Sequence, residues 1–195
     1  MKKSKVFIAC DTTNISKVKK IINQSKTKQI KIGYKFGLEF MNSKNGRKYI
    51  SKLKNKIIFV DLKLHDIPNT CVSAVKAIKD INANYLTIHI SSGLEALKAA
   101  KKVSGKTKLV GVTTLTSLTD NSLKQIGYNK KIKNLVYHQA KLANKAGLDA
   151  IVCSAKEAGY VKKVFKKEII TPGIRFNSNK NDQKRITTPK DAFKN

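Results

Sequence analysis

The sequence lacks several features that would assign it to common protein classes. Its three cysteines, Cys10, Cys71 and Cys153, are an odd number and lie far apart without a C-x-x-C pair, which argues against a disulfide framework and a zinc site. No apolar run approaches the roughly 18 residues of a membrane span, and the apolar stretch near the N-terminus is too short for a signal peptide. We therefore expect a cytoplasmic protein without a membrane partner.

Arginine, tryptophan and acidic residues are also scarce, although the formal net charge is +29. Of the 41 basic residues, three are arginines (Arg47, Arg175 and Arg185), which leaves 38 lysines spread along the whole chain. A dedicated nucleic-acid binder more often clusters its charge and uses arginine forks and stacking aromatic rings. A/T-rich codons explain the lysine content better, so no nucleic-acid partner is predicted.

The features that are present indicate one domain spanning residues 1–195, because 195 residues with 41% apolar content can bury a sizeable core. Short β-branched apolar runs alternate with longer segments of helical period, which is typical of βαβ units and a parallel sheet. The predicted strands are Lys5–Cys10, Gln29–Gly33, Lys56–Leu62, Tyr85–Ile90, Lys108–Thr113, Asp149–Cys153 and Glu168–Thr171. The predicted helices are Ile15–Gln24, Gly46–Leu53, Thr70–Ile81, Gly93–Val103, Ile132–Ala146 and Lys156–Phe165.

Polar and small residues gather at the predicted C-terminal ends of these strands, which is the face where (β/α)8 barrels build their active sites. They are Asp11, Lys31, Asp61, Lys63, His89, Ser91 and Thr113. An open dinucleotide-binding sheet also binds ligands there, but no G-x-G-x-x-G follows the first strand. Seven strands are one short of a closed barrel. The sequence therefore predicts an α/β TIM barrel that is incomplete, with its eighth strand and helix missing.

The densest polar cluster is the string DLKLHDIPNT at Asp61–Thr70. Alternate residues of a strand face the same way, so Asp61 and Lys63 should point together into the barrel mouth, with Asp66 on the following loop. A lysine held between carboxylates keeps its positive charge and can serve as a positioned acid. If the D-x-K-x-x-D segment stood alone, a surface ion pair at the end of a strand would be the better interpretation. The longer string also provides Pro68 in the loop and Thr70 as a predicted helix N-cap, which favours a functional site.

With this string the sequence resembles the orotidine 5'-phosphate decarboxylase family of pyrimidine synthesis. The resemblance spans residues 6–189 and rests on motifs in the expected order. Besides Asp61–Thr70 they are Ala9–Asp11, Ile30–Gly33, His89–Gly93, Val112–Ser117, Val152–Ser154, Thr171–Arg175 and Asn181–Gln183.

The resemblance implies decarboxylation of orotidine 5'-phosphate to uridine 5'-phosphate by a homodimer with shared active sites, without metal or cofactor. It makes Lys63 the proton donor to C6 of the pyrimidine, Asp61 the carboxylate beside the leaving carboxylate, and Lys31 the cation between these groups and the ribose. Asp66 completes the charge array from the other subunit. The remaining residues expected to bind substrate are Asp11 at a ribose hydroxyl, Thr116 at the pyrimidine ring, Ile67, Thr70, and Arg175 and Gln183 on the phosphate-side loop. His65 and His89 are assigned no catalytic role.

One departure from the family pattern concerns the phosphate site. Family members continue into an eighth strand whose Ile-Gly-Arg-type motif binds the 5'-phosphate, and we expect its loss to weaken transition-state stabilisation. Two alternatives therefore stay open: a magnesium-dependent sugar-phosphate decarboxylase or aldolase of the same suprafamily, and a non-catalytic remnant that binds or dimerises. Lys31 argues against the first, because those relatives place a carboxylate there as a metal ligand.

Overall fold

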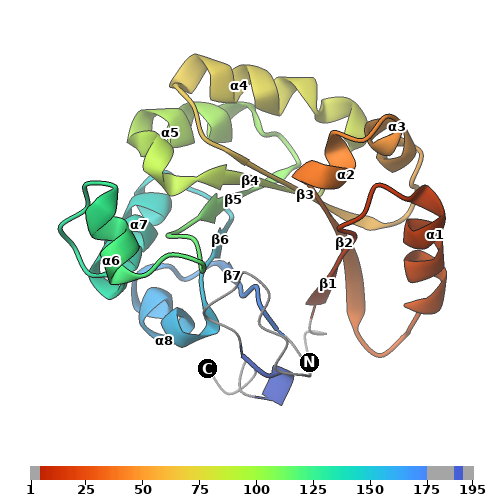
Figure 1. Ribbon diagram of the computed structural model, residues 1–195. Coiled ribbons are helices and arrows are strands. Elements are labelled where there is room, and N and C mark those ends of the chain that lie inside the picture. The colour runs from red at the N-terminus through yellow and green to blue at the C-terminus, as the bar shows by residue number, and fades with distance from the viewer. Residues whose placement is uncertain (1–4, 175–186, 191–195) are drawn as a thin grey trace.

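The computed structural model describes residues 5–174 and 187–190, which leaves Arg175 and Gln183 outside the described part (Figure 1). The described residues contain one curled sheet in which all neighbouring strands are parallel and follow chain order, β1-β2-β3-β4-β5-β6-β7. This arrangement confirms the predicted parallel sheet. The strands are β1 Lys5–Ala9, β2 Lys31–Gly37, β3 Ile57–Leu64, β4 Tyr85–His89, β5 Lys108–Val112, β6 Ala150–Val152 and β7 Glu168–Ile170.

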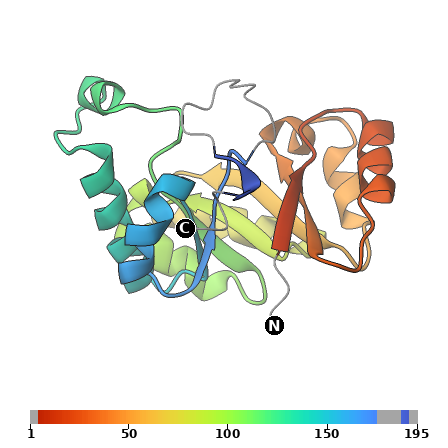
Figure 2. The ribbon, with the colours of Figure 1, turned by 90° about the horizontal axis from the view of Figure 1, so that it is seen from below.

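Helices follow the strands and cover the outer face of the curled sheet (Figure 1). They are α1 Ile15–Gln24, α2 Leu38–Met41, α3 Gly46–Ser51, α4 Pro68–Ala77, α5 Gly93–Val103, α6 Asp120–Gln125, α7 Ile132–Lys145 and α8 Ala155–Val164, with short 3-10 turns η1 Lys79–Ile81 and η2 Ile90–Ser92. The view turned by 90° shows α1 on one side of the sheet and α7 and α8 on the other (Figure 2). No helix in the described ranges is long and apolar enough to cross a membrane.

The core has two layers because side chains alternate between the two faces of each strand. Tyr34 and Phe36 of β2 belong to the large cluster that also contains the helix residues Val18 and Ile22. A smaller cluster, with Phe59, Tyr85, Val110 and Ala150 at its centre, lies on the other face of the strands. Phe7 packs against this second cluster. The missing side chain of Gly33 makes room for it, since a Cβ there would come within 2.7 Å of the Phe7 ring.

Most predicted elements are confirmed, with boundaries that shift by a few residues. Two corrections affect the site. The second strand was predicted at Gln29–Gly33 but spans Lys31–Gly37, so Lys31 begins the strand. Helix α4 starts at Pro68 with Ile67 as its N-cap residue, so the prediction of Thr70 as the N-cap is wrong. Proline fits that first helical position because it has no N–H to leave unbonded. The short helices α2 and α6 were not predicted.

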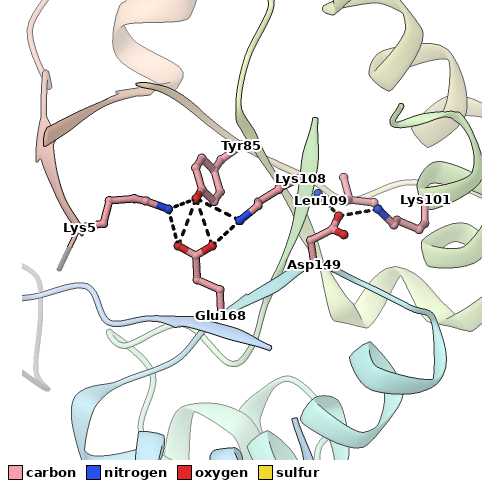
Figure 3. Close-up of polar contacts among 7 residues, drawn as sticks. All are labelled: Lys5, Tyr85, Lys101, Lys108, Leu109, Asp149 and Glu168. Carbon is pink, nitrogen blue, oxygen red and sulfur yellow. Dashed lines mark hydrogen bonds and ion pairs between the residues drawn. The ribbon is translucent and has the colours of Figure 1, made fainter. Parts of the chain in front are cut away.

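Four side chains from the N-terminal ends of the strands form what we call the Glu168 cluster (Figure 3). The Glu168 carboxylate accepts hydrogen bonds from Nζ of Lys5 and Nζ of Lys108, each at 2.9 Å, and from the hydroxyl of Tyr85 at 3.1 Å. Burial would raise the pKa of Glu168, but the two lysines outweigh it and lower the pKa. Because Lys5 begins β1 and Glu168 begins β7, this ion pair links the two edge strands of the described sheet.

Candidate active site

Four charged residues meet at the C-terminal ends of β1, β2 and β3, and we call them the Asp61 array. Oδ2 of Asp61 lies 2.9 Å from Nζ of Lys63 and 3.3 Å from Nζ of Lys35. The same Lys35 ammonium lies 3.4 Å from Oδ1 of Asp11, which follows β1. The predicted meeting of Asp61 with Lys63 at the barrel mouth is therefore confirmed, and Asp11 joins them through Lys35.

Asp61 is the most deeply placed member of the array, with 9% of its surface exposed. Burial would raise its pKa, but Lys63 and Lys35 outweigh burial, and the pKa of Asp61 is lowered. A hydrogen bond from Thr87 on β4 acts in the same direction. The carboxylate is therefore ionised at neutral pH, and it holds two ammonium groups at fixed positions beside the barrel mouth.

The position predicted for Lys31 is wrong. Lys31 is exposed and pairs with Lys5 at the start of β1 and β2, so it lies at the opposite end of the sheet from Asp61. Lys35 lies four positions further along the strand, which corresponds to about 13 Å of extended chain. Lys35 takes the expected place of the second cation. The sequence did contain a signal for the longer strand, because the alternation of Tyr34 and Phe36 with Lys35 and Gly37 continues the period of two beyond Gly33.

Asp66, Ile67 and Thr70 lie beyond the array, on the loop after β3 and the first turn of α4. The Asp66 carboxylate accepts a hydrogen bond from the backbone N–H of Ile67 at 2.7 Å and forms no ion pair with any described residue. Ile67 is 66% exposed. These two residues help to line an open groove of about 510 Å³, together with His65, Pro68, Ser91 and Ser92. In its own chain, Asp66 therefore faces outward rather than completing the array.

The two histidines beside the site interact with each other and with η2. The rings of His65 and His89 lie 5.1 Å apart, and Nε2 of His65 is 3.3 Å from Oγ of Ser91. Burial lowers the pKa of His89 to about 4, with smaller contributions in the same direction from His65 and Lys63. His89 is therefore neutral at neutral pH and adds no third positive charge to the array.

The remaining predicted site residues are placed only in part. Thr116 lies in the turn between β5 and α6, on the side of the sheet where the strands end. Arg175 and Gln183 fall outside the described residues. Sequence reasoning missed Thr87, whose only signal was a hydroxyl in the middle of the apolar run Tyr85–Ile88. Among the described residues, no three His, Cys, Asp or Glu side chains gather as a metal-binding group.

Comparison with known proteins gives consistent matches over nearly the whole chain. The model of a family described as Orotidine 5'-phosphate decarboxylase / HUMPS matches residues 4–195. A relative from Wolbachia sp. subsp. Brugia malayi, named orotidine 5'-phosphate decarboxylase, is 43% identical over 195 residues, covering 96% of this chain and 85% of the relative. One of the same name from Ehrlichia chaffeensis is 50% identical over 141 residues, covering 70% of this chain and 61% of the relative.

Solved structures agree with these matches. The crystal structure of orotidine 5'-phosphate decarboxylase from Lactobacillus acidophilus has a TM-score of 0.82 at 29% identity, covering 98% of this chain and 86% of that one. An enzyme of the same kind from Methanocaldococcus jannaschii, complexed with the inhibitor BMP, has a TM-score of 0.74 at 24% identity and supports the fold alone, over 92% of this chain and 83% of that one. The predicted TIM-barrel fold is confirmed, whereas the predicted absence of an eighth strand stays a prediction. Because the family match extends over nearly the whole sequence and rests on relatives well above 30% identity, this chain belongs to the Orotidine 5'-phosphate decarboxylase / HUMPS family.

Proposed function

We propose that this chain decarboxylates orotidine 5'-phosphate to uridine 5'-phosphate in pyrimidine biosynthesis. The observation that carries the proposal is the Asp61 array, in which Lys63 and Lys35 hold one buried carboxylate at the C-terminal face of the sheet. This arrangement occurs in a chain whose relatives at 43% and 42% identity are named orotidine 5'-phosphate decarboxylase. The array provides fixed cations at the face where barrels of this kind bind their substrates.

The array suits this reaction because loss of carbon dioxide leaves negative charge on C6 of the pyrimidine ring. We assign proton donation at C6 to Lys63, whose ammonium group is held in place by Asp61 before the substrate arrives. Cations that are already oriented stabilise developing charge without a reorganisation cost. Asp61 would then lie beside the leaving carboxylate.

Lys35, rather than Lys31, is our candidate for the cation between the reacting centre and the ribose. It contacts both Asp61 and Asp11, and Asp11 is the residue that we assign to a ribose hydroxyl. We assign Thr116 to the pyrimidine ring, Ile67 and Thr70 to further substrate contacts, and Arg175 and Gln183 to the phosphate side. The predicted cytoplasmic location stays a prediction.

We also propose a homodimer in which Asp66 of one subunit completes the array of the other. The support is that Asp66 and Ile67 face outward beside an open groove, while Asp66 has no ion-pair partner among the described residues. A two-fold dimer would bring this surface against its own copy and place both loops at the shared sites.

Mixed dimers test this arrangement. The variants Lys63→Ala and Asp66→Ala should each be nearly inactive. After subunit exchange, a mixed dimer contains one site with both defects and one site with neither, so activity should return. Exchange that is demonstrated with labelled subunits but restores no activity would place Asp66 in its own chain's site.

The reaction itself is tested by incubating the purified chain with orotidine 5'-phosphate and following formation of uridine 5'-phosphate. Activity should persist in EDTA, because the Lys35 ammonium beside Asp61 would repel a divalent cation from the position where a metal would bind. EDTA inactivation that magnesium reverses, together with turnover of a sugar phosphate, would favour the magnesium-dependent alternative. A folded chain that neither turns over nor binds these ligands would be the non-catalytic remnant.

A further inference from the structure

Strand β3 is irregular where it carries Asp61 and Lys63, its two members of the Asp61 array. Its pairing with β4 skips from Val60 to Leu64, so three residues of β3 lie opposite the single residue Thr87. The last of the three, Lys63, has a φ angle of +50°, in the left-handed region that a lysine rarely adopts. Such a conformation persists only where the surroundings hold it. The neighbouring strand β4 contacts the Lys63 backbone directly, through Thr87.

Thr87 joins both ends of the bulge through one hydroxyl group. Its Oγ1 accepts a hydrogen bond from the backbone N–H of Lys63 at 2.8 Å and donates its own to Oδ1 of Asp61 at 3.0 Å. These directions are fixed, because a backbone N–H only donates and an ionised carboxylate only accepts. Thr87 is 1% exposed, so water cannot readily replace either bond.

The contact determines which oxygen of Asp61 meets the lysines. With Oδ1 occupied by Thr87, Oδ2 is left to Nζ of Lys63 and Nζ of Lys35. Threonine suits this position because its branched Cβ restricts χ1 and so limits movement of the hydroxyl. The Lys63 backbone and the Asp61 carboxylate are therefore oriented by the same atom.

We propose that Thr87 is a positioning residue for the decarboxylation proposed above, acting through Lys63 and Asp61. The inference rests on that proposed function. Without the hydroxyl, the Lys63 N–H would be buried without its acceptor and Asp61 would lose one donor. The bulge could then relax, and the Lys63 ammonium would spend less time at the reacting centre. Since productive placement matters mainly in the transition state, the loss should appear in kcat more than in KM.

The experiment compares Thr87→Val with Thr87→Ser in the full chain. Valine keeps the branched shape without the hydroxyl, and we expect kcat to fall about 10- to 100-fold while KM changes by less than about threefold. Serine retains the hydroxyl and should recover most of kcat. Thr107→Val is the matched control, since Thr107 donates to the carbonyl of Ala83 at 2.9 Å, away from the Asp61 array. It should lose some stability while keeping kcat within about twofold of wild type.

The pH profile provides a readout that a general loss of stability would not move. Burial raises the pKa of Asp61, whereas Lys63, Lys35 and the Thr87 hydrogen bond lower it. Removing the hydroxyl should therefore raise this pKa and move the acid limb of kcat to higher pH in Thr87→Val. The profiles of Thr87→Ser and Thr107→Val should match the wild type.

Several outcomes would overturn the proposal. Native kcat in Thr87→Val, or a serine variant as slow as the valine variant, would remove the hydroxyl from any positioning role. If Thr87→Val does not fold, Thr87→Ala is compared with Thr87→Ser, because these two differ only in the hydroxyl. Failure of both hydroxyl-free variants to fold would make Thr87 structural only. A wild-type chain without decarboxylase activity would overturn the proposed function as well, whereas an active wild type with unaffected variants overturns this inference alone.

Discussion

The two ends of the sheet each carry lysines around a carboxylate, yet the backbone beneath them differs. At the N-terminal end, Lys5, Tyr85 and Lys108 lie at strand starts where the pairing with the neighbouring strands is regular, and all three donate to Glu168 (Figure 3). At the C-terminal end, the strand that carries Asp61 and Lys63 bulges, and Lys63 adopts a left-handed backbone conformation. Similar ion pairs therefore lie on regularly paired backbone at the N-terminal end of the sheet and on a bulged strand at the C-terminal end.

This difference is the one we expect between a structural cluster and the active site proposed above. Glu168 connects β1, β4, β5 and β7, so its contacts resist opening of the sheet. Asp61 connects lysines that lie at the barrel mouth, and one of them, Lys63, has the left-handed backbone conformation. Strained backbone conformations concentrate at functional sites. Lysine and carboxylate content alone would not distinguish the two clusters, whereas their position along the strands and their backbone geometry do.

The largest expected effect comes from exchanging one lysine at each end for alanine. Lys63→Ala should lower decarboxylation by about 1000-fold or more while the circular dichroism spectrum stays native, because a positioned general acid is lost from the mouth rather than the core. Lys108→Ala should leave kcat near wild type and lower the free energy of unfolding by at most about 1 kcal/mol, since its ion pair is partly exposed. A loss of less than about tenfold in Lys63→Ala, roughly 1.4 kcal/mol, would end its central role.

The second comparison uses two lysines of the same strand. Lys35→Ala should lower kcat/KM by about 10- to 100-fold, because Asp61 and Asp11 lose the cation between them. Lys31→Ala should stay within about twofold of wild type, since Lys31 is exposed at the other end of β2. Steady-state kinetics with orotidine 5'-phosphate measure both. The reverse result, with Lys31 essential and Lys35 dispensable, would restore the assignment made from the sequence.

The third comparison concerns stability. Glu168→Gln should lower the free energy of unfolding by about 1 to 2 kcal/mol, because two lysines keep their positions but lose their common countercharge. Asp80→Asn is the control, since its ion pair with Arg47 is largely exposed and should contribute less than about 0.5 kcal/mol. Urea unfolding measures both variants, and activity per folded molecule should be unchanged in each. Equal losses would show that the Glu168 cluster is an ordinary surface network.

Sequence patterns predicted the fold better than they predicted the site. Apolar runs and helical periods located all seven described strands and the main helices, because burial of one face dictates those patterns. The register of β2 was missed, since Lys31 and Lys35 both stand next to apolar residues and differ only in their distance from the end of the strand. Extending the strand by four residues, from Gly33 to Gly37, places Lys35 instead of Lys31 near its C-terminal end. The residues around the two lysines are too similar in type to reveal this difference.

Thr87 could not be assigned from the sequence for a different reason. Its role depends on a bulge in the neighbouring strand, and no pattern within β4 reports on the pairing of β3. Asp61 and Lys63 were found because the two residues are close in sequence and carry charges that a core strand would not contain. Contacts between strands, such as those from Thr87 to Asp61 and Lys63, can be recognised only when the two strands are placed side by side in the fold.

The smallest expected effect concerns His89, which titrates beside the Asp61 array. Its pKa in the folded chain is lowered from 6.5 to about 4, chiefly by burial and then by His65 and Lys63, while Asp61 opposes the shift. Between these pH values the unfolded chain binds a proton that the folded chain does not. The contribution of His89 to the free energy of unfolding should therefore be fully present above pH 6.5 and fall as the pH drops toward 4.

From pH 7 to pH 5 the loss due to His89 should be about 1 kcal/mol after allowance for partial exposure of the ring. His89→Gln should flatten the dependence in urea unfolding at these two pH values. Glu168→Gln should not, because the lowered pKa of Glu168 confines its effect to more acidic solution. A dependence that persists unchanged in His89→Gln would assign the titration to another group.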